Sequence, residues 1–125
     1  MKVPLRNPII FSLLFIAIWL NGYAQGTETG LASFYSDAFE GKKTASGEIY
    51  KSSKMTAAHR NLPFGTRVKV TNLSNNKSVT VTVNDRGPFV KDRILDLSKA
   101  AAVKLDYIDQ GVTKVKIEPI KKPKK

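Results

Sequence analysis

The chain has 125 residues, no cysteine and one histidine, and its 21 lysines and arginines outnumber its 10 acidic residues, for a formal net charge of +11. Without cysteine there can be no disulfide, no thiolate metal site and no lipid on an N-terminal cysteine, and a lone histidine argues against a transition-metal site. A positive charge of this size favours an anionic partner.

The first 24 residues have the layout of a secretory signal peptide. Lys2 and Arg6 form a positive n-region, and residues 9–20 are an almost uninterrupted apolar run. Residues 21–24 then place small residues at the two positions that signal peptidase recognises. The apolar run falls short of the roughly 20 residues that a membrane-spanning helix needs. We therefore expect cleavage after Ala24 and export to the periplasm, the envelope or the medium.

Export changes which anionic partner the charge favours. Residues 25–125 keep 19 basic and 10 acidic side chains, a net charge near +9. Nucleic acid is not expected outside the cytoplasm, whereas peptidoglycan carboxylates and anionic lipid surfaces fit that location. Alternatively, the excess lysine serves only solubility.

After a short polar lead-in at residues 25–29, one domain is expected over residues 30–120. Apolar and polar residues alternate there with period two, which is typical of half-buried strands. In chain order the expected strands cover residues 31–35, 55–59, 67–71, 79–83, 93–97 and 114–117.

Turn and cap residues complete the pattern. Residues 74–77 are typical of a hairpin turn, and Ser98 can cap a helix over residues 99–105. About six strands with one or two short helices predict an all-β barrel, which leaves no sheet edge exposed. The lysine-rich residues 121–125 are expected to form a disordered basic tail.

Asp85 is the first candidate for chemistry. It lies in the segment Asn84-Asp85-Arg86-Gly87-Pro88-Phe89 and continues the parity of the valines in the preceding strand, so its side chain should face inward or into a groove. A carboxylate there is costly unless it is paired, and such sites are often functional. The pattern leaves open the alternative that Arg86 or Arg93 is its structural partner.

His59 and Glu48 are weaker candidates when judged by pattern alone. A single histidine is more often a hydrogen-bonded structural residue than a catalyst or a ligand. Glu48 follows Gly47 in a polar loop, where a solvated position is the default. The sequence contains no Gly-rich phosphate loop, nucleophile elbow or zinc signature, so we expect no cofactor and no metal.

Five motifs, in order and at compatible spacing over nearly all of residues 30–120, resemble the rare lipoprotein A (RlpA) family. A single Asp-Arg-Gly-Pro motif would not identify the family, whereas all five motifs together are specific for it. The motifs are Gly30-Leu31-Ala32-Ser33-Phe34-Tyr35, Thr44-Ala45-Ser46-Gly47-Glu48-Ile49-Tyr50, Met55-Thr56-Ala57-Ala58-His59-Arg60-Asn61-Leu62-Pro63-Phe64-Gly65-Thr66, Val83-Asn84-Asp85-Arg86-Gly87-Pro88-Phe89 and Arg93-Ile94-Leu95-Asp96-Leu97-Ser98-Lys99-Ala100-Ala101-Ala102.

The resemblance implies a six-stranded double-psi β-barrel of the barwin and expansin type. Characterised members of the family are lytic transglycosylases that act on peptidoglycan glycan strands stripped of stem peptides. Asp85 matches the catalytic acid/base of the family, and Glu48 and His59 match the acid and the histidine of the same groove, so the resemblance implies a catalytic role for all three. The matches to neighbouring substrate-binding or supporting positions are Phe34, Tyr35, Thr44 and Arg86.

The implied reaction cleaves MurNAc–GlcNAc strands and leaves 1,6-anhydro-MurNAc ends. Most glycosidases need two carboxylates, but here the C6 hydroxyl of the substrate is the nucleophile. Asp85 can therefore act first as the acid and then as the base. Glu48 is expected beside it, with His59 hydrogen-bonded to one of the two acids.

Two features of many family members are absent from this sequence, namely a lipobox cysteine and a C-terminal repeat domain for septal targeting. We therefore expect an unlipidated monomer and leave septal targeting open. The main alternative function is a non-catalytic, expansin-like module that binds glycan in the same groove. A third is an interaction domain for another envelope protein.

Overall fold

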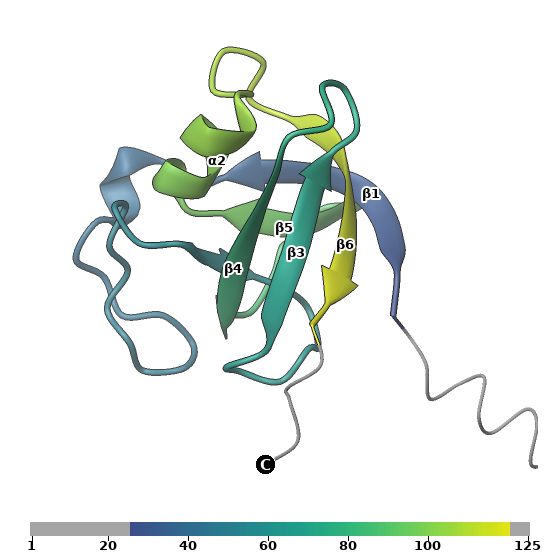
Figure 1. The fold of residues 1–125 in the computed structure, drawn as a ribbon. Helices are drawn as coiled ribbons and strands as arrows, with labels where there is room; N and C mark the ends of the chain where they lie inside the picture. Colours follow the sequence, from purple (N-terminus) through teal and green to yellow (C-terminus); the bar gives the residue numbers. More distant parts are fainter. Residues whose placement is uncertain (1–25, 121–125) are drawn as a thin grey trace, which may run out of the picture.

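A computed structural model describes residues 26–120, in which six strands close into a barrel (Figure 1). Around the barrel the strands follow the order β1, β5, β2, β4, β3 and β6. Within the described residues one α-helix and one short 3-10 helix accompany the strands, so the predicted all-β barrel is confirmed. The elements are β1 Glu28–Phe34, η2 Asp37–Phe39, β2 Thr56–Ala58, β3 Arg67–Asn72, β4 Ser78–Asp85, β5 Arg93–Leu97, α2 Lys99–Leu105 and β6 Thr113–Pro119.

The barrel is mixed. β1 pairs with β5 and β2 pairs with β4 in parallel, whereas the other four neighbouring pairs are antiparallel. The period-two alternation directs one face of each strand inward. Its core is made mainly of branched aliphatic side chains that are almost fully buried, among them Val68, Val70, Val81, Val83, Leu95, Leu97, Val115 and Ile117.

Helix α2 packs on the barrel through Ala101, Ala102 and Leu105, which are fully buried. Its first turn is capped by Ser98, whose hydroxyl oxygen accepts a hydrogen bond from the Ala101 amide. It ends at Leu105, and the following C-cap residue, Asp106, has the left-handed conformation. In Figure 1 the helix lies near the β3–β4 turn, away from the end of β4.

The end of β4 positions the candidate site. β4 runs from the hairpin turn to Asp85, and the long segment between β1 and β2 folds against this region (Figure 1). That segment contains η2 and an isolated bridge between Lys43 and Ile49. The carboxyl end of β4, this segment and the loop that leads to β5 therefore meet.

Observed and predicted element bounds agree closely. β5 and α2 have the predicted bounds, and β1 begins at Glu28, within the segment that we expect to be a lead-in. The expected signal peptide at residues 1–24 and the expected basic tail at residues 121–125 lie outside the described residues. Among residues 26–120, no helix has the length and apolar character to cross a membrane.

The described elements of the barrel form one continuous stretch of the chain. All six strands and the whole core cluster lie between Glu28 and Pro119. The protein from residue 25 onward therefore keeps every described contact of the barrel.

Candidate functional site

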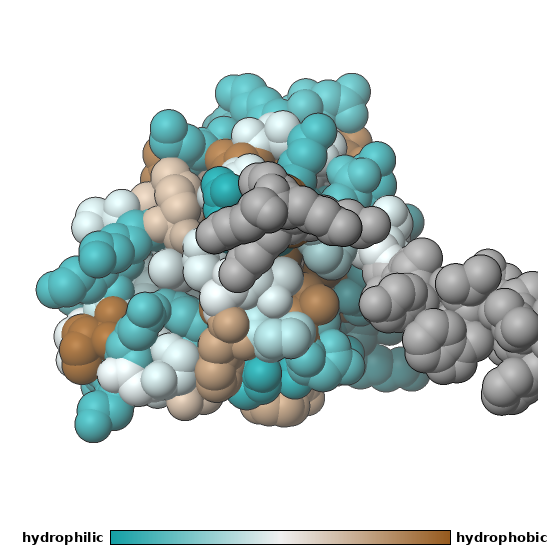
Figure 2. Space-filling model, turned by 60° about the horizontal axis from the view of Figure 1, so that its bottom comes forward, coloured by the Kyte–Doolittle hydropathy of each residue, from teal (hydrophilic) through white to brown (hydrophobic). Residues whose placement is uncertain are grey.

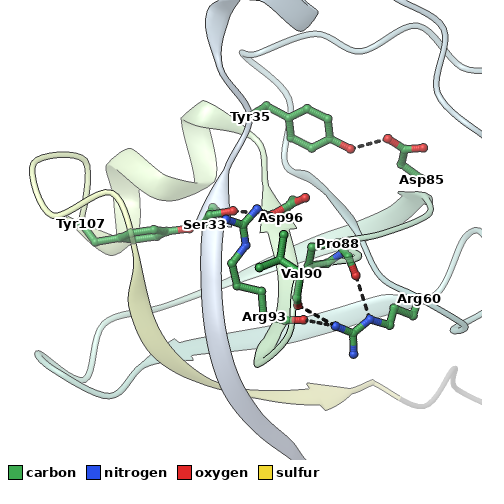
Figure 3. A network of polar contacts seen from close by, with 9 residues as sticks. All are labelled: Ser33, Tyr35, Arg60, Asp85, Pro88, Val90, Arg93, Asp96 and Tyr107. Carbon is green, nitrogen blue, oxygen red and sulfur yellow. Dashed lines mark hydrogen bonds and ion pairs between the residues drawn. The ribbon is translucent and has the colours of Figure 1, made fainter.

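Asp85 is held by hydrogen bonds rather than by an arginine. Its Oδ1 accepts hydrogen bonds from the amides of Ala45 at 2.8 Å and Arg86 at 2.9 Å, and its Oδ2 accepts one from the Tyr35 hydroxyl at 2.5 Å (Figure 3). The Arg86 guanidinium lies over the Phe64 ring, 4.0 Å from its centroid, and its Nη1 points to backbone carbonyls. Within residues 26–120 Asp85 forms no ion pair, so its structural pairing with an arginine is not observed.

The hydrogen bonds leave one acceptor position of Asp85 free. An ionised carboxylate has about four lone-pair positions, two on each oxygen. Oδ1 uses two of them and Oδ2 uses one. Among the contacts of the described residues, the free position is therefore on Oδ2, and this oxygen is the one placed to exchange a proton with a ligand.

A β-bulge produces this placement. In the parallel pairing of β2 with β4, Ala57 lies opposite Val83 and Ala58 lies opposite Asp85, so Asn84 is an extra residue. Bulges bend a strand and redirect the side chains beside them. The Asn84 side-chain amide donates a hydrogen bond to Glu48, and the Asp85 carboxylate accepts one from Tyr35. These two consecutive residues therefore contact different parts of the protein.

Asp85 lies in the wall of a cavity of about 390 Å³. Four of the predicted site residues meet there, and two further charged side chains, Arg93 and Asp96, join them. The lining residues are Ser33, Phe34, Tyr35, Ser36, Phe39, Asp85, Arg86, Arg93 and Asp96.

The aromatic side chains of this cavity are shared with the protein interior. The Tyr35 ring stacks on Tyr50 with a centroid distance of 4.4 Å and meets Phe39 edge-on at 5.5 Å. Phe34 meets Tyr107 edge-on at 5.6 Å and packs against the core. Such pairs hold their rings in place, so the aromatic wall is formed before any ligand binds.

Tyr35 is a firm hydrogen-bond donor to Asp85. Burial is the largest cause that raises the pKa of the Tyr35 hydroxyl far above its ordinary value, and the hydrogen bond and negative charge of Asp85 raise it further. Burial also raises the pKa values of Tyr107 and Tyr50. The Tyr35 hydroxyl therefore stays protonated throughout the neutral and mildly alkaline range.

These shifts predict how residues 25–125 behave in alkali. Tyr35, Tyr50 and Tyr107 are the tyrosines of that segment, and the folded barrel holds their protons more tightly than the unfolded chain does. Their contribution to stability is complete below the unfolded pKa of about 10 and falls as the pH rises above it. At about pH 11, absorbance at 295 nm should show less tyrosinate in the folded protein than in the protein unfolded in guanidinium chloride, in which the tyrosines should titrate near pH 10. Normal titration of the folded protein would contradict the burial of these hydroxyls.

Thr44 and Glu48 belong to a tight loop beside Asp85. The backbone amide and the hydroxyl of Thr44 both donate to the Glu48 carbonyl, at 2.7 and 2.8 Å. The Ala45 amide binds Asp85, and the Ser46 amide donates to the Asn84 carbonyl at 3.2 Å. Thr44 thus supports the loop that holds the Asp85 carboxylate.

The carboxylates of Glu48 and Asp85 open onto different cavities. Glu48 is exposed, accepts a hydrogen bond from the Asn84 amide at 3.0 Å, and lines a cavity of about 560 Å³ together with Lys51 and Lys54. Asp85 lines the smaller, aromatic cavity. The loop of Thr44 and Ala45 brings the two acids close in the fold, but the structure does not place them in one cavity.

The His59 side chain does not reach either acid. Its Nδ1 accepts hydrogen bonds from the amides of Asn61 and Leu62 at 3.2 and 3.1 Å, and its Nε2 lies 3.0 Å from Oε1 of Glu28. Because Nδ1 accepts, Nε2 carries the proton and donates to Glu28. His59 is 5% exposed and lines a third cavity, of about 280 Å³. The expected hydrogen bond from His59 to Asp85 or Glu48 was wrong, because Glu28 from β1 occupies that position.

The backbone of His59 does touch the site. Its amide donates to the Asp85 carbonyl at 3.2 Å, and its carbonyl accepts from Nη1 of Arg86 at 3.4 Å. His59 therefore joins the end of β2 to the end of β4, and its ring anchors that junction to Glu28.

The prediction from sequence missed Asp96 and Arg60. Asp96 accepts a hydrogen bond from the Ser33 hydroxyl and lies 3.5 Å from Nη2 of Arg93, in the same cavity as Asp85 (Figure 3). The sequence did contain a signal for Asp96, because an acidic residue stands between apolar residues of a strand. Its hydrogen-bond partner Ser33, however, is 63 positions away in the sequence. The Arg60 contacts within residues 26–120 are hydrogen bonds to backbone carbonyls, which a sequence motif cannot reveal.

The site can present a carboxylate oxygen to the polar groups of a bound ligand. It offers one carboxylate oxygen with a free lone pair, aromatic walls and two guanidinium groups. In residues 26–120, no three His, Cys, Asp or Glu side chains gather closely enough to hold a metal ion.

The comparison with family models matches this barrel directly: the model described as "Lytic transglycolase" covers residues 27–117. The chain belongs to the lytic transglycolase family. The matched range contains every candidate residue described above, and the resemblance to the RlpA family is confirmed by the relatives that follow.

Three curated relatives of this lytic transglycolase family member are named "Endolytic peptidoglycan transglycosylase RlpA". The Campylobacter jejuni protein is 55% identical over 94 residues, which cover 75% of this chain and 34% of the relative. The Neisseria meningitidis protein is 54% identical over 100 residues, 80% and 42% of the two chains, and the Rickettsia felis protein is 57% identical over 95 residues, 74% and 42%. The match thus spans less than half the length of these relatives.

Solved structures confirm the barrel type of the family. The Streptomyces papain inhibitor superposes with a TM-score of 0.63 at 26% identity, covering 78% of this chain and 96% of that one. The apo expansin of Clavibacter michiganensis gives a TM-score of 0.61 at 23% identity, covering 79% and 52%. At this identity the expansin shows the fold alone, and the fold is the predicted double-psi β-barrel of the barwin and expansin type.

Proposed function

We propose that this protein is an exported lytic transglycosylase of the cell envelope that cleaves MurNAc–GlcNAc strands of peptidoglycan, preferably stripped of stem peptides. The observation that carries the proposal is the Asp85 carboxylate, fixed by three donors in an aromatic-lined cavity with one lone pair of Oδ2 free. The family match and the names of the relatives support the same reaction class.

In this proposal Asp85 is the single acid and base. Carrying a proton on Oδ2, it protonates the oxygen that links C1 of MurNAc to GlcNAc, and the C1–O bond breaks. The C6 oxygen of the same MurNAc then forms a bond to C1, and its proton returns to Asp85. The reaction closes a 1,6-anhydro ring, consumes no water and leaves Asp85 protonated for the next cycle.

The neighbouring residues support this single carboxyl group. The amides of Ala45 and Arg86 hold Oδ1, and the Tyr35 hydroxyl orients Oδ2. Such preorganisation stabilises charge that develops in the transition state. Phe34, Tyr35 and Phe39 supply apolar contact area for sugar rings, and Arg86 closes one side of the cavity.

Glu48 has a different place in the proposal. Its carboxylate faces the cavity that contains Lys51 and Lys54, so we assign it to binding the strand beyond the cleaved bond. His59 is assigned to positioning, because its ring is committed to Glu28 and to the turn that follows it.

The test uses residues 25–125 and sacculi from which an amidase has removed the stem peptides. Mass spectrometry should detect new 1,6-anhydro-MurNAc ends. Reducing ends would contradict the transglycosylase assignment and would indicate hydrolysis with water as nucleophile, for which Asp96 is the second carboxylate in the cavity. A folded protein that sediments with the glycan but yields no products would support the binding-module alternative.

A further inference from the structure

The loop between β4 and β5 displays an aromatic ring that the reaction proposed above does not use. Phe89 is 81% exposed, whereas the other exposed large apolar side chains of residues 26–120 are 38–56% exposed. The two ends of the loop, Arg86 and Arg93, both line the Asp85 cavity. Phe89 therefore lies on a segment that borders the candidate site and gains little from packing.

Arg60 holds this loop on both sides of Phe89. Its Nε donates to the Pro88 carbonyl at 2.8 Å, and its Nη2 donates to the carbonyls of Val90 at 3.0 Å and Arg93 at 2.7 Å (Figure 3). A guanidinium is a planar fork of donors, suited to fixing several acceptors at once. The hydrogen bonds from Arg60 therefore fix the backbone on both sides of Phe89, and the loop holds its ring in the exposed position.

We propose that Phe89 is a sugar-stacking residue at the rim of the Asp85 cavity and that Arg60 is its positioning residue. The inference rests on the proposed function, which makes the ligand a glycan strand. The faces of a pyranose ring carry C–H groups with partial positive charge, and the face of an aromatic ring carries partial negative charge. A residue held in its binding position before the ligand arrives loses little freedom on binding.

The surroundings of Phe89 favour a sugar over a protein surface. Its neighbours in the loop include the charged Arg86, Lys91 and Asp92. In Figure 2 the visible described residues form interspersed hydrophilic, intermediate and apolar patches. A stable protein interface needs a larger contiguous area. One flat ring matches one sugar ring.

A tryptophan at this position would report on the contact directly. The only tryptophan of the chain, Trp19, precedes residue 25, so Phe89→Trp in residues 25–125 creates a single fluorophore. Titration with oligosaccharides from amidase-treated, peptide-free glycan should shift or quench its emission in a saturable way. The matched control is Leu73→Trp, an exposed position beyond the opposite end of β4, more than roughly 20 Å away along the strand. Its emission should not change.

Removing the ring should weaken binding without unfolding the protein. We expect Phe89→Ala to raise the half-saturating glycan concentration by about tenfold and to leave the melting temperature unchanged. Arg60→Gln should weaken binding by several fold while the exposed ring is still present, and Arg60→Lys should not restore it because one ammonium cannot match the fork. Val103→Ala, which trims an exposed apolar side chain on α2, is the control and should bind as the wild type does.

The outcomes separate this inference from the proposed function. Cleavage and binding by wild type, with both unchanged in Phe89→Ala, would overturn the stacking role and leave the transglycosylase intact. Binding that depends on Phe89 without any cleavage would refute the enzyme and retain the stacking role. Failure of wild type to bind glycan would overturn both. Unchanged glycan binding together with loss of a specific envelope protein in Phe89→Ala would assign the ring to a protein partner instead.

Discussion

Asp85→Asn is expected to reduce the formation of 1,6-anhydro ends by roughly 10²–10⁴-fold, the usual contribution of a positioned acid/base. An asparagine carbonyl oxygen can still accept from the Ala45 and Arg86 amides, so the loop and the barrel should persist. The amide cannot deliver and recover a proton. Initial rates on peptide-free glycan, with sedimentation to measure binding, should show lost turnover and retained affinity.

Asp92→Asn is the matched control for this experiment. Asp92 is an exposed acid in the same loop region, and its φ of 70° suits asparagine as well as aspartate. The control removes the same charge from the same side of the barrel and should leave the rate within about twofold, as surface substitutions usually do. Cleavage by Asp85→Asn at the wild-type rate would refute the assignment of Asp85.

The strands and the helix were predictable because their signals are local. Alternating valines in β4 follow from one buried face, and the observed strand extends the predicted one only to Ser78 and Asp85. The bounds of α2 were predicted because Ser98 caps its first turn and alanines fill its buried side. Neither inference requires knowledge of which strand lies beside which.

The grouping of site residues was only partly predictable, because it depends on pairings between distant segments. The resemblance gave Asp85, Tyr35 and Arg86 a common groove, and the structure places them in one cavity. The parallel pairing of β1 with β5 adds Asp96 through Ser33, and Glu48, hydrogen-bonded to Asn84, lines another cavity. Strand register and bulges are set by tertiary packing, so motif order alone does not reveal them.

His59 shows the same limit most clearly. The family motif that contains His59 predicts a position in the groove, and the His59 backbone amide does donate a hydrogen bond to the Asp85 carbonyl. The direction of its ring is decided by Glu28, a residue 31 positions earlier in a segment that we expected to be a lead-in. The side chain therefore leaves the cavity that its backbone helps to build.

His59→Ala is expected to lower the free energy of unfolding by about 2–4 kcal/mol, because it removes a buried ring and the acceptor of two amides. For a domain of this size, that loss corresponds to a fall of roughly 10 °C or more in melting temperature. At a temperature where the variant is still folded, the rate of glycan cleavage should stay within about tenfold of wild type. Thermal melts and initial rates on the same samples measure both effects.

His59→Asn separates a positioning role from a chemical one. Its side-chain oxygen can take the place of Nδ1 and accept from the Asn61 and Leu62 amides, a local geometry that asparagine favours. It cannot replace an imidazole in proton transfer. If the ring acts through position, this variant should recover most of the stability and the rate lost in His59→Ala, and Glu28→Gln should leave the pH–rate profile unshifted. A stable His59→Asn protein that is a hundredfold slower would place the ring in the chemistry, and Glu28 would then be the residue that orients it.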